Sequence, residues 1–198
     1  MAIPQKVKSY LDKKGLDYEE IAHKTVYTAY DAAQTMKKEL KEIAKSLLVQ
    51  ADKTFALIIV PADKRIDLGK IKKVLGAKKV SIPKEKIMIK ILKIKPGALS
   101  AFGKLHQLEV SVDKTMIKTK KAVFSTGSFT DSVFMKVKDF IQSEEAKLVD
   151  IAMKGGYQVP KIIKKKTKKV LKKKPIKKSI GRKVIKKKTV KKKVSRKK

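Results

Sequence analysis

Short apolar runs, some of them alternating with polar residues, recur along the first three quarters of the chain and indicate β-strands. The two most apolar runs, residues 43–49 and 55–60, are separated by a short polar segment and predict two strands that follow each other directly. Further strands are predicted at residues 16–23, 80–82, 108–112, 122–124 and 133–137.

Between these strands, apolar residues recur at helical spacing, and the ends of the helices carry typical capping residues. Thr28 and Asp67 are predicted N-caps, because their side-chain oxygens can accept hydrogen bonds from N–H groups of the first turn. Pro83 suits the first position of a helix, since its missing N–H needs no partner there. Helices are predicted at about residues 4–15, 28–36, 67–76, 83–92 and 138–153.

The order of these elements bears on the fold class. Strands and helices follow one another irregularly, with strand–strand neighbours as well as strand–helix neighbours. This order predicts a mixed sheet in an α/β or α+β domain instead of a doubly wound parallel sheet. Since about 150 residues suffice for one hydrophobic core, we expect a single domain over residues 1–154.

The chain changes character after Asp150, its last acidic residue. Residues 155–198 hold 20 Lys and 2 Arg without any acid, so this tail carries +22 of the formal net charge of +35. Its apolar residues stand singly or in pairs among lysine runs, and self-repulsion opposes collapse, so we expect a disordered polybasic tail. Such a tail attracts a polyanion, most simply RNA or DNA. Without an aromatic residue after Tyr157, it is expected to bind without regard to base sequence.

Several classes of protein are excluded by residues that the chain lacks. It has no Cys, and therefore no disulfide, thiolate nucleophile or Cys-ligated metal site. His23 and His106 are its two histidines, too few for a three-His zinc site. No apolar run reaches the roughly 18–20 residues of a membrane span, and the N-terminus lacks the apolar region of a secretory signal. We therefore expect a cytoplasmic protein without a membrane partner, a metal or a cofactor.

Lys45 is the most unusual residue of the predicted domain. On a strand over residues 43–49 it shares a face with Ile43, Leu47 and Val49, where an ammonium group is costly unless it holds an anion. Two other interpretations stay open. Either the strand begins later, or the lysine stem lies along apolar surface and its charge reaches the edge.

A loop of small residues lies between Gly97 and Gly103. It is not a P-loop, because five residues separate the glycines and Leu105 stands where Ser or Thr is needed. What remains is a glycine-bounded loop whose backbone N–H groups can approach a ligand closely. Elsewhere, no spacing of histidines and acids predicts a general acid–base pair or a nucleophile elbow.

A series of short segments then gives the sequence a family likeness. In chain order they are His23, Tyr27-Thr28-Ala29, Ala32-Ala33, residues 43–49, Val60-Pro61-Ala62-Asp63, Arg65-Ile66-Asp67-Leu68, residues 75–80, the Gly97 to Gly103 loop, Val112-Asp113 and Thr126-Gly127-Ser128. Over nearly all of residues 2–154 this order resembles the YbaK-type aminoacyl-tRNA deacylases. That family includes the editing domain inserted in bacterial prolyl-tRNA synthetases.

The resemblance implies a compact, barrel-like mixed sheet flanked by helices, which hydrolyses the ester between a wrong amino acid and the tRNA 3′ end. Lys45 matches the family's functional lysine, which helps to hold the terminal adenosine and its phosphate or the aminoacyl carbonyl. Gly97 begins the loop that positions the ester carbonyl and the water, and Ser100 is the third residue expected to be catalytic. Metal and covalent nucleophile are not expected, since the family relies on positioning, backbone dipoles and the tRNA's own hydroxyl. The substrate-binding residues implied by the resemblance are His23, Tyr27, Thr28, Ala98, Leu99, Ala101, Phe102, Gly103, Gly127 and Ser128.

Two departures from the family pattern concern the loop and the branch of the family. Ala101 stands where the family has Pro four residues after Gly97, and we expect a less rigid loop as a result. The histidine of the synthetase-inserted branch is missing from the Gly127 turn, where Ser-Phe-Thr fills residues 128–130. The chain is therefore expected to be a free-standing deacylase that acts in trans and captures tRNA with its tail. The amino acid that it removes stays open between Ala, Cys, Ser and others.

The competing interpretation is a non-catalytic RNA- or DNA-binding protein with a degenerate editing domain. Ala101 is its main support, whereas the retained Lys45 and Gly97 argue against it. A ribosome-associated assembly factor is a third interpretation, and the tail by itself also suits a solubilising or localisation segment. The expected partners are mischarged tRNA and, through the tail, other nucleic acid or the ribosome; the oligomeric state stays open.

Overall fold

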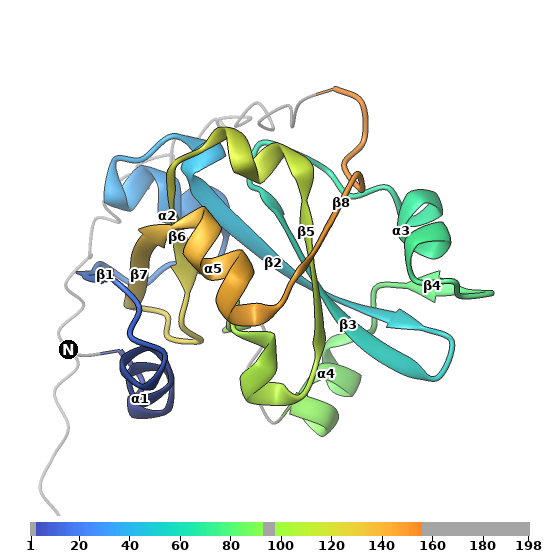
Figure 1. Cartoon of the computed structure of the whole chain (residues 1–198), viewed down its shortest axis with the longest axis horizontal. Helices are drawn as coiled ribbons and strands as arrows, with labels where there is room; N and C mark the ends of the chain where they lie inside the picture. The colour runs from blue at the N-terminus through green and yellow to red at the C-terminus, as the bar shows by residue number, and fades with distance from the viewer. Residues whose placement is uncertain (1–2, 93–97, 156–198) are drawn as a thin grey trace, which may run out of the picture. The chain divides into compact units, whose positions relative to one another are not determined.

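An antiparallel hairpin forms the centre of the sheet and carries the two most apolar runs of the sequence. The computed structural model describes residues 3–92 and 98–155, and Figure 1 shows the hairpin strands crossing the middle of this domain. β2 (Ile43–Ala51) and β3 (Thr54–Pro61) pair from Ala44↔Pro61 to Ala51↔Thr54. Both strands extend beyond their predicted ranges, because Asp52 adopts a left-handed φ of 53° and closes a tight turn.

The described residues place this hairpin inside a mixed sheet of eight strands. The sheet order is β1-β7-β6-β2-β3-β5-β8, and β4 pairs with β2. Four ladders are antiparallel, while β2–β6, β3–β5 and β5–β8 are parallel. The remaining strands are β1 (Tyr18–Ala22), β4 (Val80–Ser81), β5 (Glu109–Asp113), β6 (Lys121–Ser125), β7 (Asp131–Lys136) and β8 (Lys147–Val149).

One edge of β2 is shared by two short neighbours that do not meet. β3 occupies the other edge, so β6 and β4 must lie on this one. β6 pairs with β2 at Ile43 and Ala44, and β4 pairs with it at Gln50 and Ala51. Along residues 46–49, no described strand lies on this side of β2. The sheet is therefore split along β2, and this split positions the site described below.

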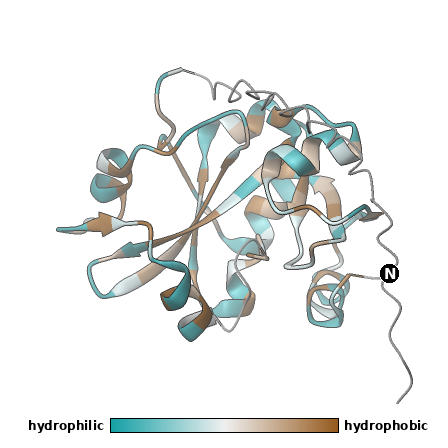
Figure 2. Ribbon diagram, turned by 180° about the vertical axis from the view of Figure 1, so that it is seen from behind, coloured by the Kyte–Doolittle hydropathy of each residue, from teal (hydrophilic) through white to brown (hydrophobic). Residues whose placement is uncertain are grey.

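Helices cover both faces of the sheet. α1 (Gln5–Lys13) and α5 (Val137–Glu144) pack on the face that carries Ala44 and Leu48, whereas α2 (Ala29–Met36) and α3 (Leu68–Val74) cover the opposite face. Figure 2 shows that the central strands carry most of the hydrophobic residues, while the helices also present hydrophilic sides. The remaining helical segments are α4 (Glu85–Leu92), η1 (Leu40–Glu42), η2 (Gly103–His106) and η3 (Lys114–Lys118).

Both predicted N-caps are confirmed. Thr28 Oγ1 accepts a hydrogen bond from the Asp31 N–H, and Asp31 Oδ2 accepts one from the Thr28 N–H, each at 3.1 Å. Asp67 Oδ1 accepts from the N–H groups of Gly69 and Lys70 at 2.9 and 3.1 Å. The caps fix the first residues of α2 and α3, as the sequence pattern predicts.

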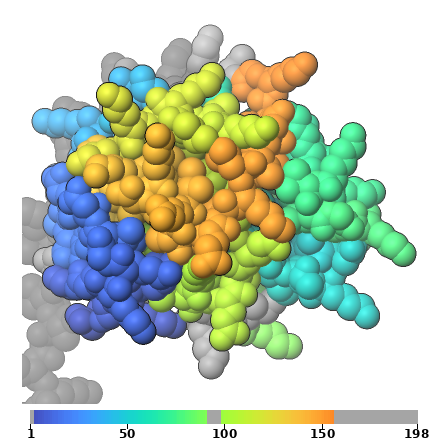
Figure 3. All heavy atoms as spheres, viewed as in Figure 1, coloured from blue at the N-terminus to red at the C-terminus, as the bar shows by residue number. Residues whose placement is uncertain are grey.

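The main core lies under α1 and α5. The rings of Phe124 and Phe140 are stacked with 4.1 Å between their centroids, and Phe102 meets Phe140 edge-on at 5.7 Å. Figure 3 shows α1 (blue) directly against α5 (orange) on this side of the domain. The Tyr10 hydroxyl joins them by donating to Glu144 Oε1 at 2.8 Å. Burial raises the pKa of the Glu144 carboxyl, although this hydrogen bond acts in the opposite direction.

The last predicted helix, residues 138–153, is wrong in its second half. α5 stops before Glu145, whose left-handed φ of 50° breaks the helix. β8 follows and pairs in parallel with β5. The carboxylate of Asp113 then holds the chain beyond β8, because Oδ2 accepts the N–H groups of Ile151 and Ala152 at 2.9 and 2.8 Å. These tertiary hydrogen bonds decide the conformation, and helical spacing of apolar residues does not reveal them.

The predicted fold class, a mixed sheet flanked by helices, is confirmed. The predicted polybasic tail lies outside the described residues, apart from Gly155, and so does Gly97. Within residues 3–92 and 98–155, no helix is both long enough and apolar enough to cross a membrane.

Replacing Asp113 by Ala is expected to lower the free energy of unfolding by about 3 kcal/mol, because buried N–H donors lose their acceptor. Burial acts to raise the pKa of Asp113, but hydrogen bonds from Thr115, Ile151 and Ala152 outweigh it and lower that pKa. A lowered carboxyl pKa stabilises the fold at neutral pH, and this contribution is lost as the pH falls below about 4. Urea unfolding at pH 7 and pH 3 measures both effects.

The matched control is Asp17→Ala, which removes an exposed carboxylate 3.8 Å from a lysine ammonium. Its expected cost is within about 0.5 kcal/mol at either pH. A cost below about 1 kcal/mol for Asp113→Ala at pH 7, or an equal cost at both pH values, would contradict the role given to Asp113.

Candidate active site

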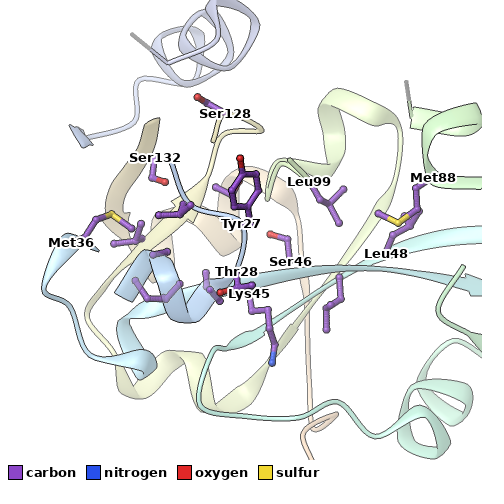
Figure 4. Close-up of a pocket in the computed structure, with 18 of the residues that line it drawn as sticks. Tyr27, Thr28, Met36, Lys45, Ser46, Leu48, Met88, Leu99, Ser128 and Ser132 are labelled. Carbon is purple, nitrogen blue, oxygen red and sulfur yellow. The ribbon is translucent and has the colours of Figure 1, made fainter. Parts of the chain in front are cut away.

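A pocket of about 370 Å³ opens where the sheet is split along β2 (Figure 4). Residues 43–48 of β2 form one wall, and α2 with the segment before it forms another. β6, the turn after it and the start of β7 line a further side, and Ile82, Met88 and Leu99 complete the lining. Most of the lining is apolar, including Met36, Leu48 and Met88. Its polar side chains are Tyr27, Thr28, Lys45, Ser46, Ser125, Ser128 and Ser132. In the described lining, therefore, the chemistry consists of one ammonium group and several hydroxyls.

Lys45 lies on β2 as the sequence predicts, and it is one of the residues that line the pocket. Lys45 Nζ donates a hydrogen bond to the carbonyl oxygen of Lys64 at 2.6 Å, in the loop after β3. Burial lowers the pKa of Lys45; the charge of Asp63 opposes this shift, and that of Arg65 adds to it. Figure 4 shows the ammonium end pointing away from Tyr27. A partly desolvated cation therefore stands beside the pocket, where an anion is attracted more strongly than in water.

The opposite face of β2 presents a hydroxyl that sequence reasoning did not assign to the site. Leu47 shares the face of Lys45, whereas Ser46 lies on the face of Ala44 and Leu48, which pack in the main core. Ser46 Oγ is buried and has no hydrogen-bond partner among the described residues. Figure 4 places it on the same side of β2 as Tyr27. The sequence signal that could have revealed this residue is its position: Ser46 stands between Ala44 and Leu48, two core residues on the same face of the strand.

The segment that follows Gly97 packs mainly into the core. Of its described residues 98–103, Leu99 alone lines the pocket. Ser100 is 3% exposed, and its Oγ accepts a hydrogen bond from the Phe102 N–H at 3.2 Å. A Cβ on Gly103 would lie 2.5 Å from a methyl group of Val110. Of the predicted site residues, Ser100, Ala101 and Phe102 therefore have buried side chains, and Gly103 stands where Val110 leaves no room for a Cβ.

Ala101, which stands where the family has proline, makes a backbone hydrogen bond that proline could not make. Its N–H donates to the carbonyl oxygen of Ser125 at 2.9 Å, which ties the loop to the end of β6. Proline has no N–H and could not make this bond. The loss of rigidity expected from the missing proline is therefore offset by a tie to the sheet.

The turn after β6 is held by the carboxylate of Asp131. Asp131 Oδ2 accepts hydrogen bonds from Ser128 Oγ at 2.9 Å and Thr130 Oγ1 at 2.5 Å. Thr126 Oγ1 donates to the Asp131 carbonyl oxygen at 2.7 Å. Burial acts to raise the pKa of Asp131, but the two hydroxyl donors lower it, so the carboxylate stays ionised at neutral pH. Ser128, a predicted site residue, is thereby fixed in the wall of the pocket.

His23, predicted to contact substrate, lies behind the pocket wall and lines a neighbouring hollow. Its Nδ1 is 2.9 Å from the carbonyl oxygen of Lys24, and its Nε2 is 2.9 Å from Ser132 Oγ. Since the carbonyl only accepts, Nδ1 is assigned as the donor to Lys24, and Nε2 is left to pair with the Ser132 hydroxyl. His23 therefore orients a pocket hydroxyl that sequence reasoning missed, because 109 residues separate the two positions.

The family of this chain follows from a match over most of the described domain. The family model of the aminoacyl-tRNA editing domain matches residues 23–142. This range contains the central hairpin and all residues named above as lining the pocket. The chain belongs to the aminoacyl-tRNA editing domain family.

Two curated relatives share part of the sequence. The prolyl-tRNA editing protein ProX of Acetoanaerobium sticklandii is 30% identical over 123 residues, which are 59% of this chain and 75% of that protein. A proline–tRNA ligase of Macrococcus caseolyticus is 26% identical over 91 residues, which are 46% of this chain and 16% of the ligase. The chain therefore matches a small part of the ligase and most of the editing protein.

Solved structures show the same fold at low sequence identity. A structure described as a candidate trans-editing enzyme for prolyl tRNA synthetase has a TM-score of 0.65 and 22% identity, covering 75% of this chain and 96% of that one. A structure from the computational grafting of epitopes onto scaffold proteins has a TM-score of 0.67 and 21% identity, with the same two coverages. The fold thus appears in proteins described in very different terms, and the function has to be argued from the site.

Gly127→Ala is expected to lower the free energy of unfolding by about 2 kcal/mol, because two costs coincide at this position. The φ of Gly127 is +89°, and an added Cβ would lie 3.3 Å from the carbonyl oxygen of Ala98. Gly15→Ala is the matched control, since its φ is +62° but open space surrounds the added Cβ. We expect about 1 kcal/mol for the control by urea unfolding. Equal costs for the two variants would show that the contact with Ala98 carries no weight.

Proposed function

We propose that this chain is a trans-acting hydrolase that deacylates mischarged tRNA by hydrolysing the ester at its 3′ end. The observation that carries the proposal is the pocket in the split of the sheet, with Lys45 and hydroxyls in its lining. A cation suits the phosphate of a nucleotide, and hydroxyls suit the oxygens of a ribose ester. Membership of the editing-domain family supports the class of reaction.

In this proposal Lys45 binds the 3′-terminal phosphate of the tRNA or the carbonyl oxygen of the aminoacyl group. In the structure Lys45 Nζ donates a hydrogen bond to the neutral carbonyl of Lys64, and the charge of Asp63 favours its protonated form. A substrate oxygen carrying negative charge is a stronger partner for a partly buried ammonium group than a neutral carbonyl. Substrate binding therefore recovers part of the free energy that burial of Lys45 costs.

The proton transfer is assigned to the substrate. In the described lining of the pocket no carboxylate or imidazole is found, so no side chain there is a conventional general base. The ribose hydroxyl next to the ester can act in place of a protein general base and accept a proton from the attacking water. The water oxygen bonds to the carbonyl carbon while the neighbouring hydroxyl accepts one proton of the water and donates its own to the ester oxygen of the ribose. The bond between the carbonyl carbon and that oxygen breaks, which releases the free amino acid and the ribose hydroxyl. The same set of side chains offers a metal ion no usual ligands, and the proposed hydrolysis is metal-independent.

Positioning is the contribution that the protein itself makes. Ser46 Oγ faces the pocket without a partner among the described residues and is assigned to orient the water or a ribose oxygen. The Asp131 network fixes Ser128 in the pocket wall, and the hydrogen bond from the Ala101 N–H to Ser125 ties the loop that carries Leu99 to β6. Groups fixed in advance cost no reorganisation at the moment of reaction, which is the main source of catalysis when strong acids and bases are absent.

The proposed substrate is tRNA for proline that carries a wrong, small amino acid. ProX and the ligase are both named for prolyl-tRNA or proline, and one structural neighbour is described as acting in trans for the prolyl enzyme. A synthetase pocket distinguishes one methylene by only about 1–3 kcal/mol, so small amino acids escape its selection. A pocket of about 370 Å³ that also admits a ribose leaves room for a small side chain against Met36 and Leu48.

Release of labelled amino acid from a panel of mischarged tRNAs tests this proposal. Wild-type protein is expected to deacylate one or a few small amino acids and to be insensitive to a chelator. Lys45→Met, which keeps the aliphatic stem and removes the ammonium group, is expected to lower kcat/KM about a hundredfold. To test specificity for the tRNA, the rate of deacylation is compared between tRNA for proline and another tRNA that carries the same amino acid.

The matched control is Lys53→Met, in the exposed turn between β2 and β3, which is expected to keep full activity. Urea unfolding of each variant separates loss of activity from loss of fold. Background hydrolysis by wild type on every tRNA, despite tight binding, would reject the enzyme and favour the non-catalytic RNA-binding protein.

The polybasic tail is proposed to supply affinity for tRNA. If about 8 of its charges meet phosphates, log(1/KM) of the full chain should fall with log[salt] at a slope of roughly −6. Deleting residues 155–198 is expected to raise KM, flatten this slope and leave kcat within about twofold. Steady-state kinetics at several salt concentrations measures all three. Loss of turnover at saturating tRNA, in a truncated protein that still unfolds cooperatively, would contradict this division of roles.

A further inference from the structure

An exposed aromatic side chain, that of Tyr27, lies in the wall of the pocket and packs against the partly buried Phe129. The side chain of Tyr27 lines the pocket although it is 68% exposed. Its ring centroid is 5.4 Å from that of Phe129, and the two ring planes are tilted by 53°. The tilt leaves one face of Tyr27 uncovered by Phe129. Figure 4 shows the Tyr27 ring standing between Ser132 and Leu99, with its hydroxyl on the side of Ser128.

The backbone on both sides of the pair is fixed. The N–H of Val26 donates to the carbonyl oxygen of Phe129 at 2.9 Å, and the N–H of His23 donates to that of Thr130 at 2.8 Å. Tyr27 directly precedes the capping box of α2, and Phe129 lies within the turn held by Asp131. A ring presented by two anchored segments loses little freedom when a ligand covers it. The exposure of Tyr27 is therefore built into the fold.

We propose that Tyr27 is the stacking platform for the base of the 3′-terminal nucleotide of tRNA, and that Phe129 is a positioning residue that sets the tilt of the ring. This inference rests on the proposed function, because it takes the tRNA 3′ end as the occupant. With the ester in the pocket beside Lys45, the ribose fills the mouth and its base leaves the pocket. There the base meets the open face of Tyr27, and proteins hold unpaired RNA bases on such faces.

The surroundings of Tyr27 match a single base better than a protein partner. Lys24 and Thr25, close before it in the chain, are exposed and polar, and so is Thr28 after it. The chain next to this exposed ring is therefore polar, whereas a protein interface needs a contiguous apolar area. The tail has no aromatic residue after Tyr157, so stacking has to be supplied by the domain.

Binding of a short RNA that ends in CC-2-aminopurine tests the platform without any turnover, using the full-length protein. The fluorescence of the 3′-terminal 2-aminopurine is expected to be quenched by wild type and by Tyr27→Phe. Tyr27→Ala is expected to abolish the quenching and to weaken binding about tenfold. Phe129→Ala is expected to give partial quenching, because the ring stays but its tilt is no longer fixed. Ile117→Ala, at another exposed apolar residue outside the pocket, is the matched control and should behave as wild type.

Deacylation kinetics on the same variants separates this inference from the function on which it rests. Tyr27→Ala is expected to raise KM about tenfold with kcat little changed, since the base is remote from the ester carbon. If wild type deacylates tRNA but Tyr27→Ala keeps both its KM and the quenching, the platform is wrong and the function stands. If wild type quenches 2-aminopurine through Tyr27 but deacylates nothing, the platform stands and the enzyme is wrong. Quenching that survives in Tyr27→Ala also rejects the platform.

Discussion

The split along one edge of β2 is the constraint on which the rest of the site depends. β6 leaves β2 after Ala44, and β4 joins it at Gln50, so residues 46–49 have no described strand on that side. A continuous ladder would place a strand where the pocket lies. Because the strand is open there, both of its faces contribute to the pocket wall: Lys45 and Leu47 from one, Ser46 and Leu48 from the other. Because the sheet is interrupted here, β2 alone contributes both the ammonium group of Lys45 and the hydroxyl of Ser46 to the pocket lining.

Buried or turn aspartates stabilise the segments around this split. Asp52 accepts the N–H groups of Lys78 and Lys79 and so fixes the approach to β4. Asp131 holds the turn between β6 and β7, which carries Ser128. Each carboxylate converts a loop into a defined structure by accepting several donors, and charged acceptors make the stronger hydrogen bonds. In a chain with 18 acids against 53 basic residues, the acids placed at these turns act as structural anchors.

Local patterns were sufficient to predict most elements, and tertiary contacts explain the failures. The caps at Thr28 and Asp67 and the strand around Lys45 depend on neighbouring residues, and all three are confirmed. The helix predicted through residues 138–153 is wrong in its second half because Asp113, far away in the sequence, binds the backbone after β8. The face that Lys45 shares with Leu47 followed from alternation alone. That Ser132 is oriented by His23 could not follow from any local pattern, because only the pairing of β1 with β7 brings them together.

Under the proposed function, the pocket and the tail meet different demands of a tRNA substrate. Attraction of the tail acts on any polyanion and depends on charge alone, so it increases encounter without selecting among RNAs. Selection has to come from groups that are fixed relative to one another, since a displacement of about 1 Å at a reacting centre is costly. Lys45 on a sheet strand and Tyr27 beside a helix cap are fixed in this way, by β-pairing with β3 and by the hydrogen bonds of Thr28. A tail that selected its substrate would need such anchors too, and repeated lysines without acids or aromatic residues supply none of them.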